Sequence, residues 1–232
     1  MTTPGTAIRL ISSMATRALA AELVAQFAGS TPGVVQVESV GGVDAARRVA
    51  GGEAFDGVVL AAPAIDTLMA AGHLLPGSRI DLVKSAVAAA VRTGSPLPAI
   101  HSEEVLRQAV LAARSVGYST GPSGVQLIAL FERWGVRALL GDRLVQAPAG
   151  VPVASLVARG EVELGFQQLS ELMGVPGITL LPPLPDSVQI VTTFSAGIAR
   201  TSGRADEVRA LLALWASPAA EATKRRCGME PA

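Results

Sequence analysis

The sequence predicts an α/β protein of two lobes, each a mostly parallel sheet flanked by helices, with two crossover strands joining them. Half of the 232 residues are apolar, 16% are charged and the mean hydropathy is +0.44, which supports a well-buried core. Aromatic residues make up only 3%, so Ala, Val, Leu and Ile must build that core, as in parallel strands buried on both faces. Short apolar runs also alternate with segments of helical periodicity.

The first third of the chain alternates strands and helices three times. Ala15, Leu19, Leu23 and Phe27 recur every four residues and so share one helix face. This strand–helix order predicts parallel strands with right-handed crossovers. The expected strands are 7–11, 34–39 and 58–62, and the expected helices are 14–27, a segment around 45–49, and 64–71.

The rest of the chain predicts a discontinuous first lobe. Long β-rich runs at 84–91 and 188–199 bracket a middle segment, so the expected lobes are 1–83 with 194–232, and 84–193. Two crossovers of this kind form a natural hinge. Ser102 is suited to cap a following helix. The other expected strands are 116–119 and 163–166, and the expected helices are 103–113, 125–134, 168–173, 205–216 and 218–226.

Composition excludes several classes of function. With 19 basic and 19 acidic side chains, the chain lacks the basic surplus of a nucleic-acid binder. Cys227 and two histidines cannot assemble a Cys/His zinc site, and neither a Gly-x-Gly-x-x-Gly motif nor a P-loop appears, so we expect no metal and no cofactor. No apolar run approaches the roughly 20 residues of a membrane helix. The first residues show no signal peptide, which favours the cytoplasm as written, or the periplasm if a leader was removed.

Small polar residues follow the predicted strands, where open parallel sheets bind their ligands. Serine hydroxyls and exposed backbone N–H groups at helix N-termini suit a small anion, which we expect in the cleft between the lobes. The plainer alternative is that these are ordinary loop residues and helix caps. The candidate ligand-binding residues are Ser12, Ser13, Met14, Ser39, Gly41, Ala62, Lys84, Ser119, Thr120, Ser123, Gly124 and Gln167.

Several strings together resemble the bacterial molybdate-binding proteins, which have the type II periplasmic-binding-protein fold. They are Ile11-Ser-Ser-Met-Ala-Thr16, the loop with Ser39, Phe55-Asp-Gly-Val-Val-Leu-Ala-Ala62, Gly117-Tyr-Ser-Thr-Gly-Pro-Ser-Gly124 and Gly160-Glu-Val-Glu-Leu-Gly-Phe-Gln-Gln168. The resemblance covers nearly the whole chain, and the order and spacing of the strings are more specific than any one of them. It implies a solute-binding protein of the ABC-transporter type, with a permease as partner.

In that family a hydroxyl after the first strand, a hydroxyl in the second loop, and N–H groups with a tyrosine from the second lobe hold the oxyanion. Carried over, Ser12 or Ser13 and Ser39 take the first two roles, and the 119–124 loop supplies the second lobe's contacts. The tyrosine has no match, because Phe166 and Gln167 stand at the corresponding strand end. Gln167 or Gln168 would instead address a larger, carboxylate-bearing ligand.

Anion binding without chemistry is the first expectation, and an enzyme of the aconitate-isomerase type is the alternative, because aconitate isomerase resembles these proteins in fold. Shifting an allylic proton needs a group that takes and returns it. The candidates are Lys84, His73, Tyr118 and Glu171. Each has a plainer interpretation, respectively a strand-flanking charge, a helix end, a core side chain and a solvated charge. Regulatory or other ligand-binding roles also stay open.

Overall fold

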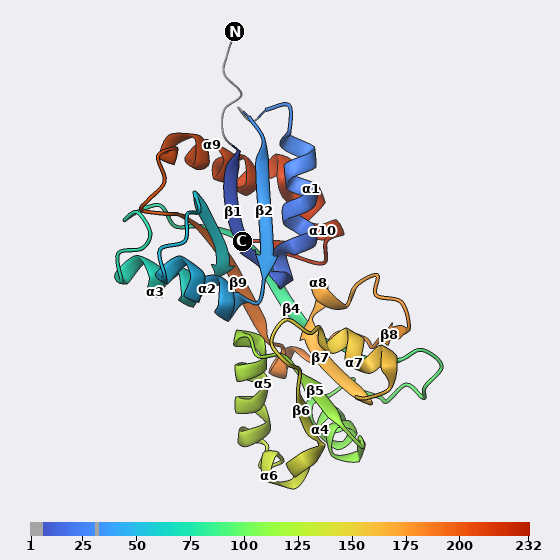
Figure 1. Ribbon diagram of the computed structural model, residues 1–232. Helices are drawn as coiled ribbons and strands as arrows, with labels where there is room; N and C mark the ends of the chain where they lie inside the picture. The colour runs from blue at the N-terminus through green and yellow to red at the C-terminus, as the bar shows by residue number, and fades with distance from the viewer. Residues whose placement is uncertain (1–6, 31–32) are drawn as a thin grey trace. The chain divides into compact units, whose positions relative to one another are not determined.

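The computed structural model describes residues 7–30 and 33–232. The chain divides into two compact units, Met1–Lys84 with Thr193–Ala232 (unit 1) and Ser85–Thr192 (unit 2). Strand β4 (Ile80–Arg92) carries the chain from unit 1 into unit 2, and β9 (Val191–Ile198) carries it back. Figure 1 follows this path by colour from the N-terminus to the C-terminus.

The sheet of unit 1 is built around β1, which pairs in parallel with β2 on one side and β3 on the other. This confirms the parallel pairing that the strand–helix alternation predicts. β9 then adds to β3 in the antiparallel direction, and β10 pairs antiparallel with the first part of β4. The strands are β1 (Ile8–Ser13), β2 (Val35–Val40), β3 (Gly57–Ala61) and β10 (Glu230–Pro231).

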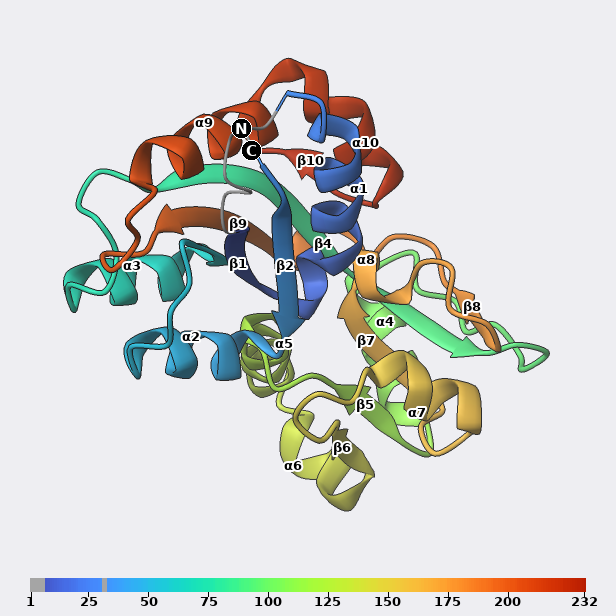
Figure 2. The same ribbon diagram turned by 45° about the horizontal axis from the view of Figure 1, so that its top comes forward.

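Helices cover both faces of this sheet (Figure 2). One face packs on α1, α9 and α10 through a core that includes Leu23 and Trp215, and the other packs on α2 and α3 through Ile65 and Leu68. Burying each such side chain contributes roughly 1.5–3 kcal/mol. The helices are α1 (Arg17–Phe27) after a 3-10 turn (Met14–Thr16), α2 (Gly42–Ala50), α3 (Ala62–Ala70), α9 (Ala205–Ala216) and α10 (Glu221–Arg226).

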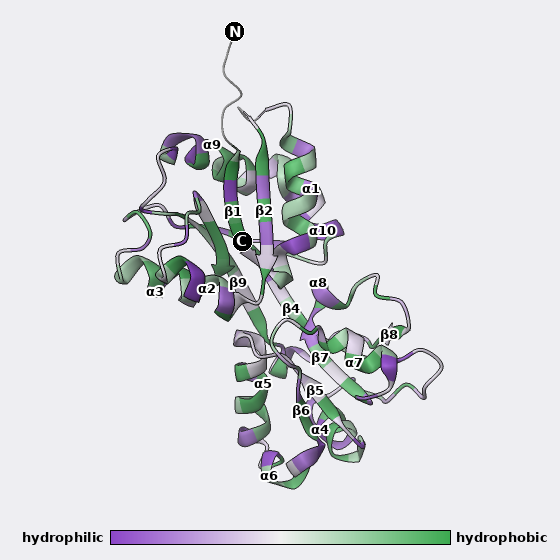
Figure 3. Ribbon diagram, viewed as in Figure 1, coloured by the Kyte–Doolittle hydropathy of each residue, from purple (hydrophilic) through white to green (hydrophobic). Residues whose placement is uncertain are grey.

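The edge strand β2 is half polar, which Figure 3 shows as hydrophilic colour along it. Gln36 and Glu38 point outward, and Arg48 from α2 forms ion pairs with Glu38 and Glu53. Charged side chains on an edge oppose pairing with another chain.

Unit 2 has the same layered plan. β5 pairs in parallel with β6 and β7, while β7 and β8 pair antiparallel with the second part of β4. Helices α4 and α5 pack on one face of the sheet, and α7 and α8 on the other. The elements are α4 (Glu103–Ala112), β5 (Val116–Tyr118), α5 (Pro122–Arg133), α6 (Arg137–Leu140), β6 (Leu144–Gln146), α7 (Val153–Arg159), β7 (Leu164–Gln168), α8 (Leu169–Leu172) and β8 (Ile178–Leu180).

Some element boundaries differ from the sequence-based expectations. α5 begins at Pro122, three residues earlier than expected, because proline is well suited to the first turn of a helix. Gln168 ends strand β7 and does not open the next helix, so both Gln167 and Gln168 belong to the strand. Over the described residues, every helix is too short or too polar to cross a lipid bilayer.

Candidate functional site

Ser12 and Ser39 lie side by side at the carboxyl ends of β1 and β2. The parallel register places them opposite each other, and their Oγ atoms are 2.7 Å apart. Ser12 is fully buried and Ser39 is half-buried. Either hydroxyl can donate to the other. When Ser12 donates, the proton of Ser39 remains for an acceptor outside the pair.

Three helical N-termini meet the same edge of the unit 1 sheet. Ser13 precedes the turn that starts at Met14, Gly41 precedes α2, and Ala62 is the first residue of α3. Among the described residues neither α2 nor α3 has a side-chain cap, so the first N–H groups of these two helices keep their capacity to donate. The Ser13 hydroxyl oxygen lies 3.4 Å from the hydroxyl oxygen of Thr16. The edge therefore offers several donors suited to an anion.

The two proposed proton carriers of unit 1 stand on other segments than these donors. His73 follows the C-terminal end of α3, and its carbonyl accepts from the Arg200 amide. Lys84 is exposed on β4, where its backbone pairs with Glu230 of β10.

In unit 2, the loop that joins β5 to α5 folds tightly over its own backbone. Ser119 and Ser123 bring their Oγ atoms to 3.4 Å, with Thr120 exposed between them. A Cβ on Gly124 would lie 1.9 Å from the Ser119 carbonyl oxygen, so only glycine fits. Gly121 caps α5 without a side-chain bond among the described residues, which leaves the first N–H groups of a 12-residue helix able to donate.

Glu171 stands beside the end of β7 and has an unusual pKa. Gln167 Nε2 donates to Glu171 Oε1 at 2.8 Å, and Gln167 Oε1 accepts from the Ala154 amide at 3.3 Å. Burial raises the pKa of the Glu171 carboxyl to about 7, and the bond from Gln167 lowers it by a smaller amount. A carboxyl that titrates near neutrality can take and return a proton.

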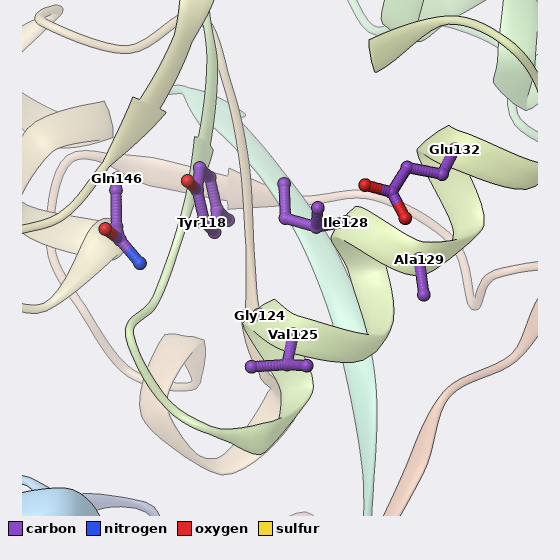
Figure 4. Close-up of a pocket in the computed structure, with 7 residues that line it drawn as sticks. All are labelled: Tyr118, Gly124, Val125, Ile128, Ala129, Glu132 and Gln146. Carbon is purple, nitrogen blue, oxygen red and sulfur yellow. The ribbon is translucent and has the colours of Figure 1, made fainter.

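Tyr118 faces a different part of unit 2. It lines an open pocket of about 320 Å³ together with one face of α5, and Figure 4 shows it with Gln146 on the wall opposite that helix. Neither Ser119 nor Glu171 is among the lining residues, which are Tyr118, Gly124, Val125, Ile128, Ala129, Glu132 and Gln146. Over residues 7–30 and 33–232, no cluster of three or more His, Cys, Asp or Glu side chains is placed to hold a metal ion.

Sequence reasoning missed the Ala154 amide, which holds Gln167. One signal in the sequence could have located this amide. Pro152 stands just before Val153, and proline commonly stands at the start of a helix, here α7.

Comparison with known proteins decides the family. The model of the bacterial extracellular solute-binding proteins matches residues 8–230, almost the full chain. The chain belongs to the bacterial extracellular solute-binding proteins. The sequence is also 39% identical over 186 residues to an aconitate isomerase from a Pseudomonas species, covering 80% of this chain and 71% of that protein.

Solved structures of solute-binding proteins share the fold. The periplasmic molybdate-binding protein of Azotobacter vinelandii superposes with a TM-score of 0.81 at 19% identity, over 96% of this chain and 98% of that one. A sulfate-binding protein from Mycobacterium tuberculosis gives 0.77 at 17% identity, over 98% and 87%. These likenesses confirm the predicted α/β periplasmic-binding-protein-like fold, and the family match confirms the expected kinship with solute-binding proteins.

Proposed function

We propose that this chain binds a small di- or tricarboxylate and moves an allylic proton on it, as an aconitate isomerase does. The observation that carries the proposal is the Glu171 carboxyl, whose pKa of about 7 lets it act as base and acid at neutral pH. The sequence relative that is an aconitate isomerase supports the same reaction class.

The reaction needs one group that both removes and returns a proton. Ionised Glu171 takes the proton from a methylene carbon next to the alkene, the double bond moves by one position, and the protonated carboxyl returns the proton to the former alkene carbon. No electron is gained or lost overall. Gln167 holds Oε1 of Glu171 and leaves Oε2 for the substrate.

The carboxylates of the substrate need donors. Hydrogen bonds to a charged group contribute roughly 1.5–3 kcal/mol each. In unit 2, the Ser119 and Ser123 hydroxyls and the uncapped N-terminus of α5 supply several, enough to offset an association cost of about 4–15 kcal/mol.

Proton NMR tests this proposal. The whole chain is incubated with cis-aconitate or trans-aconitate in D₂O, and the alkene signals are followed. We expect interconversion with deuterium entering the substrate, and no change with Glu171→Gln. An unchanged spectrum with the wild-type chain rejects the isomerase activity.

A second candidate function is binding of an inorganic oxyanion for ABC-type transport, with a permease as partner and the periplasm as location after export. The Ser12–Ser39 pair favours it, because two hydroxyls with nearby helical N–H groups can bind an anion without a basic side chain. Calorimetry with molybdate, tungstate, sulfate and tricarboxylates separates the candidates. Tight molybdate binding with no tricarboxylate binding would favour transport.

A further inference from the structure

Three buried polar side chains share one face of neighbouring strands in unit 2. Val87 of β4 lies opposite Gln168 of β7, and the Val87 amide donates to the Ile190 carbonyl at 2.8 Å. Side chains on a strand alternate, so Ser85 is on the same face as Val87 and Gln168. Val87 thus lies opposite Ile190, just before β9. Two residues further along this antiparallel pairing, Thr192 of β9 lies opposite Ser85.

Two atoms of this group lack a partner among the described residues. Gln168 Nε2 donates to Thr192 Oγ1 at 2.8 Å, which leaves the carboxamide oxygen. Neither that Oε1 nor the Ser85 hydroxyl meets a hydrogen-bonding atom, although Ser85, Gln168 and Thr192 are 0%, 3% and 4% exposed. Buried polar atoms are nearly always paired, so two orphans on one face indicate a site for another molecule.

The surroundings define the chemistry of that molecule. The same face carries the apolar side chains of Val87, Phe166 and Ile190, which would not stabilise a charge. Gln168 Oε1 needs a donor, and the Ser85 hydroxyl can donate to an acceptor.

We propose that Ser85, Gln168 and Thr192 form a subsite for one uncharged carboxylic acid group of the ligand. The acid O–H donates to Gln168 Oε1, and its C=O accepts from Ser85. This inference rests on the proposed carboxylate function, and it assigns Ser85 as a specificity-determining residue. A fully ionised tetrahedral oxyanion has no proton to give to Gln168 and fits less well.

The experiment compares the whole wild-type chain with Ser85→Ala and with Ser195→Ala as matched control. Ser195 is equally buried, but its hydroxyl donates to Asp81 Oδ1 at 2.6 Å. Calorimetry measures trans-aconitate and molybdate binding, and melting is followed without ligand. For Ser85→Ala we expect trans-aconitate affinity to fall about tenfold, molybdate affinity to change less than about twofold, and the melting temperature to rise by about 2–4 °C. Ser195→Ala should lower the melting temperature and leave affinity unchanged.

The outcomes separate the two proposals. If the wild-type chain binds trans-aconitate and Ser85→Ala binds it equally well, the subsite is wrong and the proposed function stands. If the wild-type chain binds no tricarboxylate, the proposed function fails and takes the subsite with it. A lower melting temperature of Ser85→Ala would mean that a structural water pairs the hydroxyl, which overturns the inference. A larger loss for molybdate than for trans-aconitate would mean that the Gln168 amide presents Nε2 to an ionised group, which overturns it as well.

Discussion

Gln167 donates from Nε2 to Glu171 Oε1 over 2.8 Å while its own Oε1 accepts from the Ala154 amide. The carboxyl is therefore held from one side by an amide that is itself fixed. Burial raises the pKa of Glu171 and the bond from Gln167 lowers it, and the net result is a pKa of about 7. The charge of this carboxyl can therefore be tested by replacing Glu171, and the effect of its hydrogen bond can be tested by replacing Gln167.

Replacing Gln167 with leucine should move the activity profile to higher pH. The substitution removes the bond that favours the ionised carboxyl, so the pKa of Glu171 rises further. A bond worth roughly 1.5–3 kcal/mol corresponds to about one to two pH units. Isomerase kcat/KM between pH 5 and 9 measures the midpoint, and Gln146→Leu at the end of β6, which β5 separates from β7, is the control. An unmoved midpoint would mean that Gln167 does not act on the reacting carboxyl.

Glu171→Gln should stabilise the fold at high pH and not at low pH. The pKa of Glu171 is raised from 4.5 to about 7 in the folded protein. Protonation of this carboxyl therefore stabilises the wild-type fold fully below pH 4.5, and this stabilisation is lost as the pH rises through 7. Glutamine stays neutral, so the difference in unfolding free energy should grow to at most about 3 kcal/mol at pH 8. Urea unfolding at pH 4.5 and pH 8 measures it.

Glu161→Gln is the control for that experiment, because its carboxyl has the opposite shift. The bond from Arg159 lowers the pKa of Glu161, so this variant should lose a little stability at pH 8. Equal behaviour of the two variants would argue against the environment described for Glu171.

Ser39→Ala should weaken anion binding without unfolding the protein. The substitution removes the half-buried hydroxyl that pairs with Ser12 near the carboxyl end of β2. One lost hydrogen bond to a charged ligand corresponds to about a 10- to 100-fold loss of affinity. Titration calorimetry with the ligand found for the wild-type chain measures the change. Ser217→Ala, whose hydroxyl donates to the Leu214 carbonyl at the end of α9, should bind as the wild-type does. Equal affinity of Ser39→Ala and wild type would remove the serine pair from the site.

Local patterns predicted much of the fold. The apolar spacing gave α9 its correct bounds, and Ser102 caps α4 by accepting from the Val105 amide, as expected. Short elements were missed, because β6 and β8 have three residues each and no periodicity develops over so few positions. The antiparallel pairing of the crossover strands depends on contacts distant in sequence, which no local pattern contains.

The candidate site was predictable to a lesser degree. Serines and glycines after strands could be read as donors, since the carboxyl edge of a parallel sheet follows from strand order. The raised pKa of Glu171 could not, because it depends on how deeply the folded chain buries the carboxyl, which no local pattern contains. The sequence suggested a solvated helix charge as the plainer interpretation, and the partly buried carboxyl beside Gln167 is not one.

Gly124→Ala should disturb both stability and binding. The new Cβ would lie 1.9 Å from the oxygen and 2.9 Å from the carbon of the Ser119 carbonyl, and backbone atoms cannot turn away as a flexible side chain can. Overpacking of this kind costs about 1–3 kcal/mol, and moving the loop would also separate Ser119 from Ser123. Gly121→Ala, only three residues away, has its nearest neighbour at 3.9 Å, the Ser119 Oγ, and should be nearly neutral. Thermal unfolding and anion titration of both variants measure this. If Gly124→Ala were as stable as Gly121→Ala, the 119–124 loop could not follow the tight path on which its donors depend.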